Sequence, residues 1–403
     1  MIHIAWLGKK SPFCGNVTYS LTTTEALRQR GHQVSFIHFD TPAGSTLHRN
    51  DPIVPRSRPA GGVEVLSELA RDNPEVTLPY LVKSQVYTIP SPGALRELRE
   101  SLERLRPDVV HASLTLSPLD FRLPDLCQHL GVPLVATFHP AFDANLRNIA
   151  AGTQQLTYQV YAPSLARYDR VIVFSELQAD LLERLGVPHH RLAVIPNGVD
   201  TDTWAPAGLT SQRQQSDLRQ RFGGRRVFLY MGRLSTEKNV EALLKAWRLV
   251  RPAGCLLLIV GDGPLRSALQ HNEADVLWWG YEGDLQRRVA LLQAAEVFLL
   301  PSLVEGLSLA LLEAMACGKA CVATDAGADG EALEGGAGIV ISTQGVTTQL
   351  RTLLPVLRDQ PLLTAELGRR ARSRVLDRYT LSRNIDAIEQ LYTDLPRRPV
   401  AVA

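Results

Sequence analysis

The sequence lacks any arrangement of cysteines that would build a disulfide framework or a metal centre. Its five cysteines are scattered over 403 residues and form no C-x-x-C pair, which favours a reducing compartment and a role as small buried hydrophobic residues. Cys317 and Cys321 stand four positions apart, but no histidine or further cysteine completes a zinc ligand set beside them. No Asp-x-Asp pair directly follows a predicted strand, so we predict no metal site.

The sequence also lacks an excess of one charge and a long apolar run. Lys and Arg number 43 against 41 Asp and Glu, which speaks against a nucleic-acid binder with a broad basic surface. No apolar stretch approaches the length of a bilayer span, and the opening MIHIAWLGKK has its lysines after the apolar run instead of before it. We therefore expect no transmembrane helix and no signal peptide, and hence a cytoplasmic protein. Peripheral binding to the cytoplasmic face of a membrane stays open.

What the sequence does contain is a repeated alternation of short apolar runs with helix-forming segments, which is typical of parallel sheets covered by helices. The runs of the first half lie at residues 2–7, 33–38, 108–112, 134–137 and 170–174, and those of the second half at residues 227–231, 256–260, 297–300 and 320–323. The pattern predicts an α/β protein with two doubly wound domains. A segment rich in Pro, Ser and Gly at residues 41–59 is predicted to be a long surface loop.

The two series meet at a polar, proline-containing stretch that begins at Pro196. We place the domain boundary there, because such stretches connect domains that each have their own core. The predicted division is a first Rossmann-like domain over residues 1–198 and a second over residues 199–380. A C-terminal helix over residues 381–403 is predicted to pack back on the first domain.

The most informative stretch, residues 301–316, follows a predicted buried strand directly and has the sequence PSLVEGLSLALLEAMA. Glycine lets backbone approach a ligand, and the start of a helix offers oriented N–H groups and a positive dipole to a phosphate. Glu305 and Glu313 bracket this feature, and carboxylates suit the hydroxyl groups of a sugar. The alternative is an ordinary strand-to-helix turn with two surface glutamates. The residues that would present the amides are Gly306, Leu307, Ser308 and Leu309.

Two further segments also follow predicted strands directly. Gly232, Arg233 and Lys238 come after the strand at 227–231, where two cations can neutralise a diphosphate; the alternative is a pair of exposed salt-bridge residues. Gly261 opens a Gly-Asp-Gly-Pro turn after the next strand, a motif that alone is most often a plain turn. Because open α/β folds bind ligands at the carboxyl ends of parallel strands, we expect these segments to form one site.

With these motifs the sequence resembles, over nearly its whole length, the family-four retaining glycosyltransferases of the GT-B type, which have two Rossmann-like domains with a cleft between them. Glu305 and Glu313 resemble that family's E-x7-E pair, the segment GRLSTEKN at residues 232–239 resembles its diphosphate loop, and the turn that starts at Gly261 resembles its GDGP turn. The resemblance implies that Arg233 and Lys238 hold the diphosphate. It also implies that Glu313 binds the ribose hydroxyls and that Glu305 binds the hydroxyls of the donor sugar.

The resemblance extends to the first domain. His139, in the run Thr-Phe-His after a strand, resembles a histidine of the family that faces the donor sugar, although a lone histidine is more often structural. Gly15 resembles the glycine-rich loop that meets the nucleotide phosphates, with one glycine where the family commonly has two or more. Residues 194–200 match the interdomain hinge, and Trp279 stands where the family's backbone meets the base.

The resemblance implies a retaining, metal-independent transfer of a hexose from a UDP-sugar, UDP-galactose or UDP-glucose, with no cofactor beyond this donor substrate. The opening HIAWLGKKSPFCGNVTYS is similar to cyanobacterial family-four enzymes, among them digalactosyldiacylglycerol synthases, so the expected acceptor is a membrane glycolipid such as a galactolipid. Apolar residues 80–82 beside Lys83 suit either a lipid surface or the core. A soluble sugar or sugar-phosphate acceptor, a sugar-nucleotide epimerase and a silent nucleotide-sugar binder stay open. The catalytic residues implied are His139, Arg233, Lys238 and Glu305.

Overall fold

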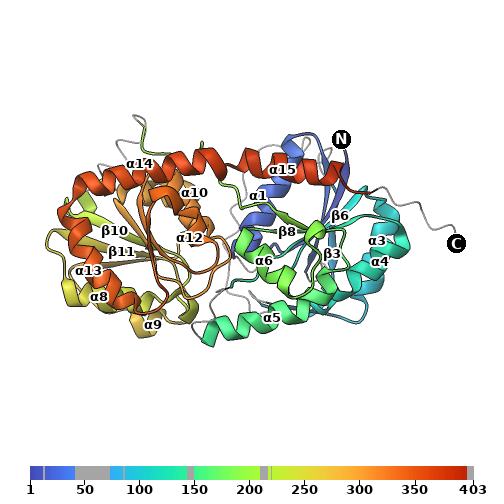
Figure 1. Ribbon diagram of the computed structural model, residues 1–403, viewed down its shortest axis with the longest axis horizontal. Coiled ribbons are helices and arrows are strands. Elements are labelled where there is room, and N and C mark those ends of the chain that lie inside the picture. The colour runs from blue at the N-terminus through green and yellow to red at the C-terminus, as the bar shows by residue number, and fades with distance from the viewer. Residues whose placement is uncertain are drawn as a thin grey trace, which may run out of the picture.

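The computed structural model describes residues 1–11, 14–40, 73–84, 87–142, 149–208, 217–218 and 220–396. The surface loop predicted for residues 41–59 lies outside them. Within the described residues the chain forms two parallel sheets covered by helices, and these stand side by side along the long axis of the molecule (Figure 1). The predicted α/β architecture with two doubly wound Rossmann-like domains is confirmed.

The first sheet has seven parallel strands in the order β3-β2-β1-β6-β7-β8-β9. Almost every residue of its central strands is buried, because helices cover both faces of a parallel sheet. The strands are β1 (His3–Gly8), β2 (Gln33–Phe39), β3 (Glu75–Leu78), β6 (Val109–Ser113), β7 (Leu134–Thr137), β8 (Arg170–Val173) and β9 (Leu192–Val194). The helices of this half are α1 (Gly15–Gln29), α3 (Ala94–Leu105), α4 (Leu123–Leu130), α5 (Ile149–Leu165) and α6 (Glu176–Arg184), with short 3₁₀ turns η1 (Pro118–Arg122) and η2 (His189–Arg191).

The second sheet has six parallel strands in the order β12-β11-β10-β13-β14-β15. Its strands are β10 (Arg226–Met231), β11 (Cys255–Val260), β12 (Val276–Gly280), β13 (Val297–Leu300), β14 (Ala320–Thr324) and β15 (Ile339–Ile341). The helices are α8 (Val240–Val250), α9 (Arg266–Leu269), α10 (Leu285–Ala294), α11 (Leu309–Ala316), α12 (Asp329–Ala332), α13 (Val346–Asp359) and α14 (Pro361–Arg378), with 3₁₀ turns η4 (Thr236–Lys238) and η5 (Glu334–Gly336).

Strand order reverses once in each sheet. In the second sheet the chain runs outward from β10 through β11 to β12 and then returns to add β13 on the other side of β10. The loops after β10 and β13 therefore diverge at a topological switch point, where open α/β sheets bind their ligands. The equivalent reversal in the first sheet lies between β1 and β6.

The chain crosses between the two domains at residues near Val199 and Thr380. Val199 N donates to Tyr379 O at 2.8 Å, and Leu381 N donates to Val199 O at 2.9 Å. Gly198 lies so close to the second crossing that a Cβ atom on it would be 2.7 Å from Leu381 Cα. The predicted boundaries at residues 198/199 and 380/381 fall at these crossings, and the domain division stays a prediction.

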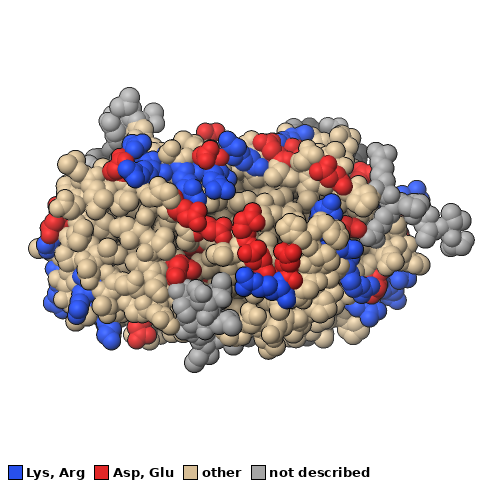
Figure 2. Space-filling view, viewed as in Figure 1, with Lys and Arg blue, Asp and Glu red and all other residues tan. Residues whose placement is uncertain are grey.

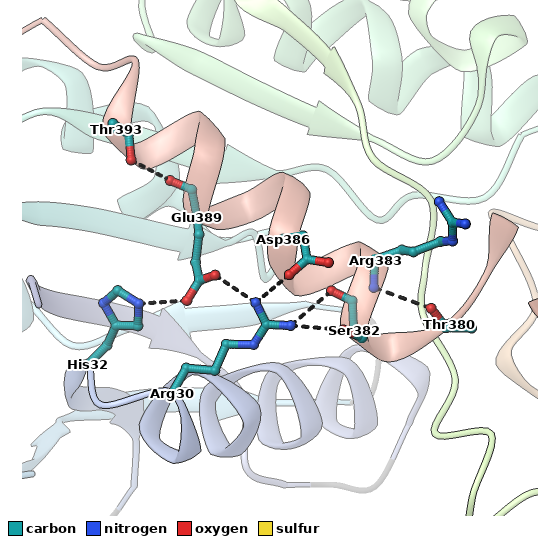
Figure 3. A network of polar contacts seen from close by, with 8 residues as sticks. All are labelled: Arg30, His32, Thr380, Ser382, Arg383, Asp386, Glu389 and Thr393. Carbon is teal, nitrogen blue, oxygen red and sulfur yellow. Dashed lines mark hydrogen bonds and ion pairs between the residues drawn. The ribbon is translucent and has the colours of Figure 1, made fainter. Parts of the chain in front are cut away.

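Helix α15 (Leu381–Thr393) follows α14 and lies along α1 of the first sheet (Figure 1). Figure 3 shows Arg30 reaching from the end of α1 to α15, where it donates to Glu389 Oε2 at 2.7 Å and contacts Asp386. His32 Nε2 lies 2.7 Å from Glu389 Oε1. Polar contacts thus hold helix α15 against the first domain.

A narrow crevice runs between the domains, and it is lined by acidic side chains from both and by basic side chains from the second. Glu176 comes from the first domain, and Glu331, Glu334, Arg374 and Arg378 come from the second. Figure 2 shows acidic side chains gathered near the middle of this face, with basic side chains beside them. Apolar and aromatic residues, among them Phe174 and Leu307, complete the lining, so the crevice combines charged and apolar surfaces.

A short antiparallel hairpin, β4 (Tyr80–Lys83) and β5 (Thr88–Pro90), stands apart from the first sheet. Tyr80 packs against the hydrophobic core of the first domain, whereas Leu81 and Val82 are 58% and 43% exposed. The core interpretation of these residues is therefore wrong for Leu81 and Val82, because a two-stranded hairpin has one face without a layer over it. In the described part of the chain no helix is long and apolar enough to cross a membrane.

Candidate active site

The loops that follow β10 and β13 bring an ion pair together at the switch point of the second sheet. Lys238 Nζ, at the end of η4, lies 2.5 Å from Glu305 Oε1. Ser302 Oγ donates to the same carboxylate oxygen at 2.7 Å. The Lys238 side chain is 24% exposed and that of Glu305 is 8% exposed, so the pair is largely shielded from water but remains accessible on the lysine side.

The pair keeps Lys238 positively charged in spite of its burial. Burial lowers the pKa of Lys238, but the adjacent Glu305 carboxylate outweighs it, so the net change is upward from the ordinary lysine value. A cation held in this way is available to an anion that enters from the open side.

Tight backbone packing shapes the loop that presents Lys238. Gly261 has a φ of +138°, and a Cβ atom on it would lie 1.8 Å from Gly232 O. At Gly263 a Cβ atom would lie 2.3 Å from Leu234 O. Leu234 N donates to Asp262 O at 2.9 Å. The Gly-Asp-Gly-Pro turn therefore supports the loop after β10. This packing by itself explains why both positions are occupied by glycine, because it leaves no room for a Cβ atom.

Arg233 lies on the same loop and is held less firmly. Its Nη1 atom is 3.9 Å from Glu237 Oε1, and its side chain is 41% exposed. Glu237 in turn accepts from Ser235 Oγ at 2.6 Å. Because an exposed pair at this distance is weak, the guanidinium can turn toward an anion at little cost.

The start of α11 is already partly bonded within the chain. Ser308 caps the helix, with its Oγ accepting from Leu311 N at 3.3 Å, and its own N–H donates to Asp329 Oδ1 at 2.8 Å. Gly306 O accepts from Ala328 N at 2.7 Å, and Leu307 O accepts from Asn197 Nδ2 at 2.8 Å. Of the amides predicted to face a phosphate, that of Ser308 is thus occupied by an internal carboxylate.

Glu313 faces inward from α11 and meets a partner that the sequence did not indicate. Arg288 Nη2, on α10, donates to Glu313 Oε2 at 2.7 Å. Burial raises the pKa of Glu313 to about 7, although Arg288 acts to lower it. Glu305 and Glu313 are 6% and 4% exposed, so the alternative interpretation as two surface glutamates is wrong.

Trp279 lies near the end of β12 with one ring face covered. The Arg221 guanidinium lies 4.4 Å from the centroid of the Trp279 ring, and Trp279 Nε1 donates to Glu282 Oε2 at 3.1 Å. The following residue, Gly280, accepts from Gly261 N at 2.8 Å. The predicted base site is thereby linked to the Gly-Asp-Gly-Pro turn.

On the first domain, His139 stands in a network of neutral hydrogen-bonding groups. Ser113 Oγ lies 2.8 Å from His139 Nε2 and donates to Asn16 Oδ1 at 2.9 Å. Burial lowers the pKa of His139 to about 3, and the charge of Lys9 adds to this. The imidazole is therefore neutral, and its contact with Ser113 holds the ring in place.

The two halves of the site meet through backbone. Phe142 N donates to Glu305 O at 2.8 Å across the domain junction. A Cβ atom on Gly306 would lie 3.4 Å from His139 O. The structure therefore brings the strand end that carries His139 against the loop that carries Glu305.

Gly15 is the first residue of α1, and a Cβ atom on it would meet no atom within 4 Å. Steric crowding therefore gives no reason for glycine at this position. The two residues at 12–13 of its predicted glycine-rich loop lie outside the described residues. Lys9, at the end of β1, is only 3% exposed and is a nearby cation that the sequence did not single out.

Comparison with known proteins assigns the chain to a family. A model described as Glycosyltransferase Family 4 matches residues 15–203, and one described as Glycosyl transferases group 1 matches residues 225–359. A GDP-mannose-dependent alpha-mannosyltransferase of Mycolicibacterium smegmatis is 31% identical over 326 residues, which cover 78% of this chain and 77% of the relative. The chain belongs to glycosyltransferase family 4.

Other relatives of this family 4 glycosyltransferase differ in donor and acceptor. The UDP-Gal:alpha-D-GlcNAc-diphosphoundecaprenol alpha-1,3-galactosyltransferase of Escherichia coli is 26% identical over 330 residues, which cover 75% of this chain and 79% of that one. A crystal structure of Anabaena HepE in complex with UDP superposes with a TM-score of 0.73 at 18% identity, covering 98% of this chain and 100% of that one. Sucrose-phosphate synthase of Thermosynechococcus elongatus also gives 0.73, at 20% identity, with 98% of each chain covered. The fold is therefore GT-B.

The site of this glycosyltransferase contains residues that sequence reasoning missed. Arg288, Ser113 and Asn16 each bond to a predicted site residue or to its direct partner, but none belongs to a motif that marks it. Asp329 was also missed, and only its place a few residues after a strand end is a signal. Among the described residues no group of three or more His, Cys, Asp or Glu side chains could hold a metal ion.

Proposed function

We propose that this glycosyltransferase moves a hexose from a UDP-sugar, UDP-galactose or UDP-glucose, to a lipid-linked acceptor with retention of configuration. The observation that carries the proposal is the buried Lys238–Glu305 pair, which lies at the switch point and is bonded through Phe142 to the domain that holds His139. A cation beside a carboxylate suits a diphosphate joined to a sugar, since the first binds phosphate and the second accepts from hydroxyl groups.

Each predicted site residue has a place in this proposal. Lys238 and Arg233 neutralise the diphosphate, and the two cations supply the charge that a metal ion would otherwise supply. Glu305 binds the hydroxyls of the donor sugar, Glu313 binds the ribose, and His139 contacts the sugar from the first domain. Around the nucleotide we place Gly15, Gly232, Gly261, Trp279, Gly306, Leu307, Ser308 and Leu309, with the Ser308 N–H bonded to Asp329 and not to a phosphate.

The chemistry follows from the state of these groups. The bond from the anomeric carbon to the diphosphate oxygen breaks, and the leaving oxygen keeps the electron pair beside Lys238 and Arg233. The acceptor hydroxyl attacks from the same face and must lose its proton. His139 is neutral and its Nε2 atom contacts Ser113, and we assign the acceptor's proton to the departing diphosphate oxygen. Closure of the two domains over the donor excludes water from this step.

Two observations support a lipid-linked acceptor and a protein that binds the cytoplasmic face of a membrane. The relatives include enzymes whose names specify an undecaprenol diphosphate and a phosphatidylinositol dimannoside as acceptors. The first domain also exposes apolar side chains on its hairpin, namely Leu81, Val82, Tyr87 and Ile89. A soluble acceptor, epimerisation of the nucleotide sugar and silent binding are outcomes that the experiment distinguishes.

The test is to incubate the purified protein with UDP-galactose, UDP-glucose and GDP-mannose, each with and without glycolipid acceptors in detergent. Release of the nucleotide diphosphate from one UDP-sugar only in the presence of a lipid, with the α-linked product identified, would support the proposal. Loss of release in Lys238→Ala and Glu305→Ala, but not in the exposed controls Lys245→Ala and Glu241→Ala, would locate the site. Release from GDP-mannose alone, release with soluble sugars alone, or an epimerised free nucleotide sugar would each contradict it.

A further inference from the structure

Asp329 is a third acidic residue at the candidate donor site, beside Glu305 and Glu313, and backbone packing holds the segment before it against the Glu305 loop. It is the first residue of α12, and the segment before it lies directly on the loop after β13. Gly327 has a φ of +57°, and a Cβ atom on it would lie 2.1 Å from Glu305 O. Ala328 N donates to Gly306 O at 2.7 Å. Asp329 therefore cannot move away from Glu305 without disturbing this loop.

The Asp329 carboxyl group is only half satisfied. The residue is 0% exposed, and its Oδ1 accepts from Ser308 N at 2.8 Å. Its Oδ2 is enclosed and meets no hydrogen-bond partner among the described residues. Because an ionised carboxylate needs donors for both oxygens when it is buried, this environment favours the protonated acid.

Taken together, the surroundings of Asp329 also favour its protonated form, although not every neighbouring charge does so. Glu305 faces it from the loop after β13 and Lys238 from η4, but Lys238 is already 2.5 Å from Glu305. The start of α11 contributes only the Ser308 amide. Glu331, on the same helix as Asp329, accepts instead from Leu177 N on α6 at 3.3 Å. Burial and then Glu305 raise the pKa of Asp329 well above its ordinary value, and they outweigh Ser308 and Lys238.

We propose that Asp329 is a positioning residue of the donor site that works as a neutral acid, fixing the Ser308 amide at the start of α11 and keeping the charge around Lys238 from becoming negative. This inference rests on the proposed donor site and goes beyond it, because it couples the binding of the donor to the uptake of a proton by Asp329. An anionic donor beside Asp329 favours its protonated form further, so donor binding is accompanied by proton uptake wherever the free protein has lost that proton.

The sign of the pH dependence follows. Donor affinity is constant below the pKa of Asp329 in the free protein and falls as the pH rises above it, by up to about tenfold per pH unit for one linked proton. Asp329→Asn keeps an oxygen for Ser308 and cannot ionise. We expect this variant to bind donor with the low-pH affinity of the wild type at every pH and to take up no proton.

Calorimetric titration of the full-length protein with UDP-glucose and GDP-mannose tests the proposal, because the diphosphate diesters of these probes do not titrate near neutral pH. Each titration is run between about pH 6 and about pH 9, in pairs of buffers with different ionisation enthalpies, which gives the number of protons taken up. Asp325→Asn is the matched control, because Asp325 directly follows strand β14 in the loop that leads to Asp329 and accepts from Thr343 N at 3.1 Å. Glu313→Gln examines the other carboxyl group of the site whose pKa burial raises.

Proton uptake in the wild type that disappears only in Asp329→Asn supports the proposal. Uptake that persists in Asp329→Asn, or that disappears in Glu313→Gln instead, overturns it while donor binding itself stands. If the wild type takes up no proton in this range, a neutral Asp329 predicts that Asp329→Asn binds donor as tightly as the wild type, and weaker binding by this variant overturns the proposal. If neither nucleotide sugar binds at any pH, the proposed function fails and the inference fails with it. Circular dichroism shows whether Asp329→Asn folds; if it does not, the wild-type proton count together with the Glu313→Gln and Asp325→Asn counts decides.

Discussion

The two domains face each other with different chemistry. The second domain presents charged pairs, Lys238 with Glu305 and Arg288 with Glu313, that are largely removed from water. The first domain presents a neutral imidazole, His139, held by a serine and an asparagine among aromatic rings. Charged groups suit an anionic nucleotide, whereas neutral and aromatic groups suit a sugar and an acceptor. We therefore expect donor recognition mainly from the second domain.

The largest effect is expected from removing the cation of the second domain. Lys238→Ala deletes a charge that we place on the leaving diphosphate and leaves Glu305 buried without its partner. Loss of one preorganised stabilising group costs about 100-fold to about 1000-fold in kcat. The measurement is nucleotide diphosphate release at saturating acceptor. Lys245→Ala, which removes an exposed lysine of α8, is the control. A fall smaller than about threefold would move the diphosphate away from Lys238.

The fold and the meeting of Lys238 with Glu305 could be predicted from sequence because their signals are local. Each apolar run of a buried parallel strand is visible without its neighbours. Lys238 and Glu305 each lie a few positions after such a run, and the carboxyl ends of neighbouring strands meet at one sheet edge. The neighbourhood of Lys238 and Glu305 can therefore be inferred without knowing any long-range contact between side chains.

The remainder of the site could not be predicted because it depends on partners far apart in the chain. Arg288 reaches Glu313 from another helix, and Asn16 reaches Ser113 from a segment 97 residues away. The burial of Glu313 is likewise a property of helix packing, since a glutamate on a helix is equally compatible with an exposed face. The glycine at 261 shows the same limit, because its close approach to Gly232 appears only once both loops are folded.

A smaller effect is expected from the neutral network of the first domain. His139→Ala removes a hydrogen-bonding group worth about 1–3 kcal/mol, or about fivefold to about 150-fold in kcat/KM. Ser113→Ala leaves the ring in place but frees its orientation, so we expect about tenfold or less. The exposed histidine of α4 provides the control, His129→Ala. Equal losses for Lys238→Ala and His139→Ala would remove the distinction between the domains, and unchanged kinetics in His139→Ala would reduce the network to packing.

Glu313 gives a prediction about stability and pH. Its pKa in the folded state, about 7, lies above the ordinary value of 4.5, so between these values the folded protein binds more protons than the unfolded chain. Stability from this group is therefore full below about pH 4.5 and is lost as the pH rises to about 7. Glu313→Gln removes that loss, and we expect it to gain about 2–3 kcal/mol on the wild type between about pH 5 and about pH 8. Denaturant unfolding at both pH values measures the difference; a constant offset would show that Arg288 keeps Glu313 ionised throughout.

The smallest effect is expected from the hairpin of strands β4 and β5 in the first domain, which exposes apolar side chains. Leu81→Ser combined with Val82→Ser removes two exposed aliphatic side chains that contribute about 1 kcal/mol if they are partly buried in lipid, or about fivefold in vesicle binding. Sedimentation with anionic phospholipid vesicles measures this binding, and Leu362→Ser, which changes an 84% exposed leucine of the second domain, is the control. Because the hairpin is remote from Lys238 in the sequence and lies on the other domain, donor binding should not change. A loss of vesicle binding in Leu362→Ser alone would place the membrane-facing surface on the second domain and reverse the comparison, whereas a loss confined to the hairpin variant would assign the lipid side of the reaction to the first domain.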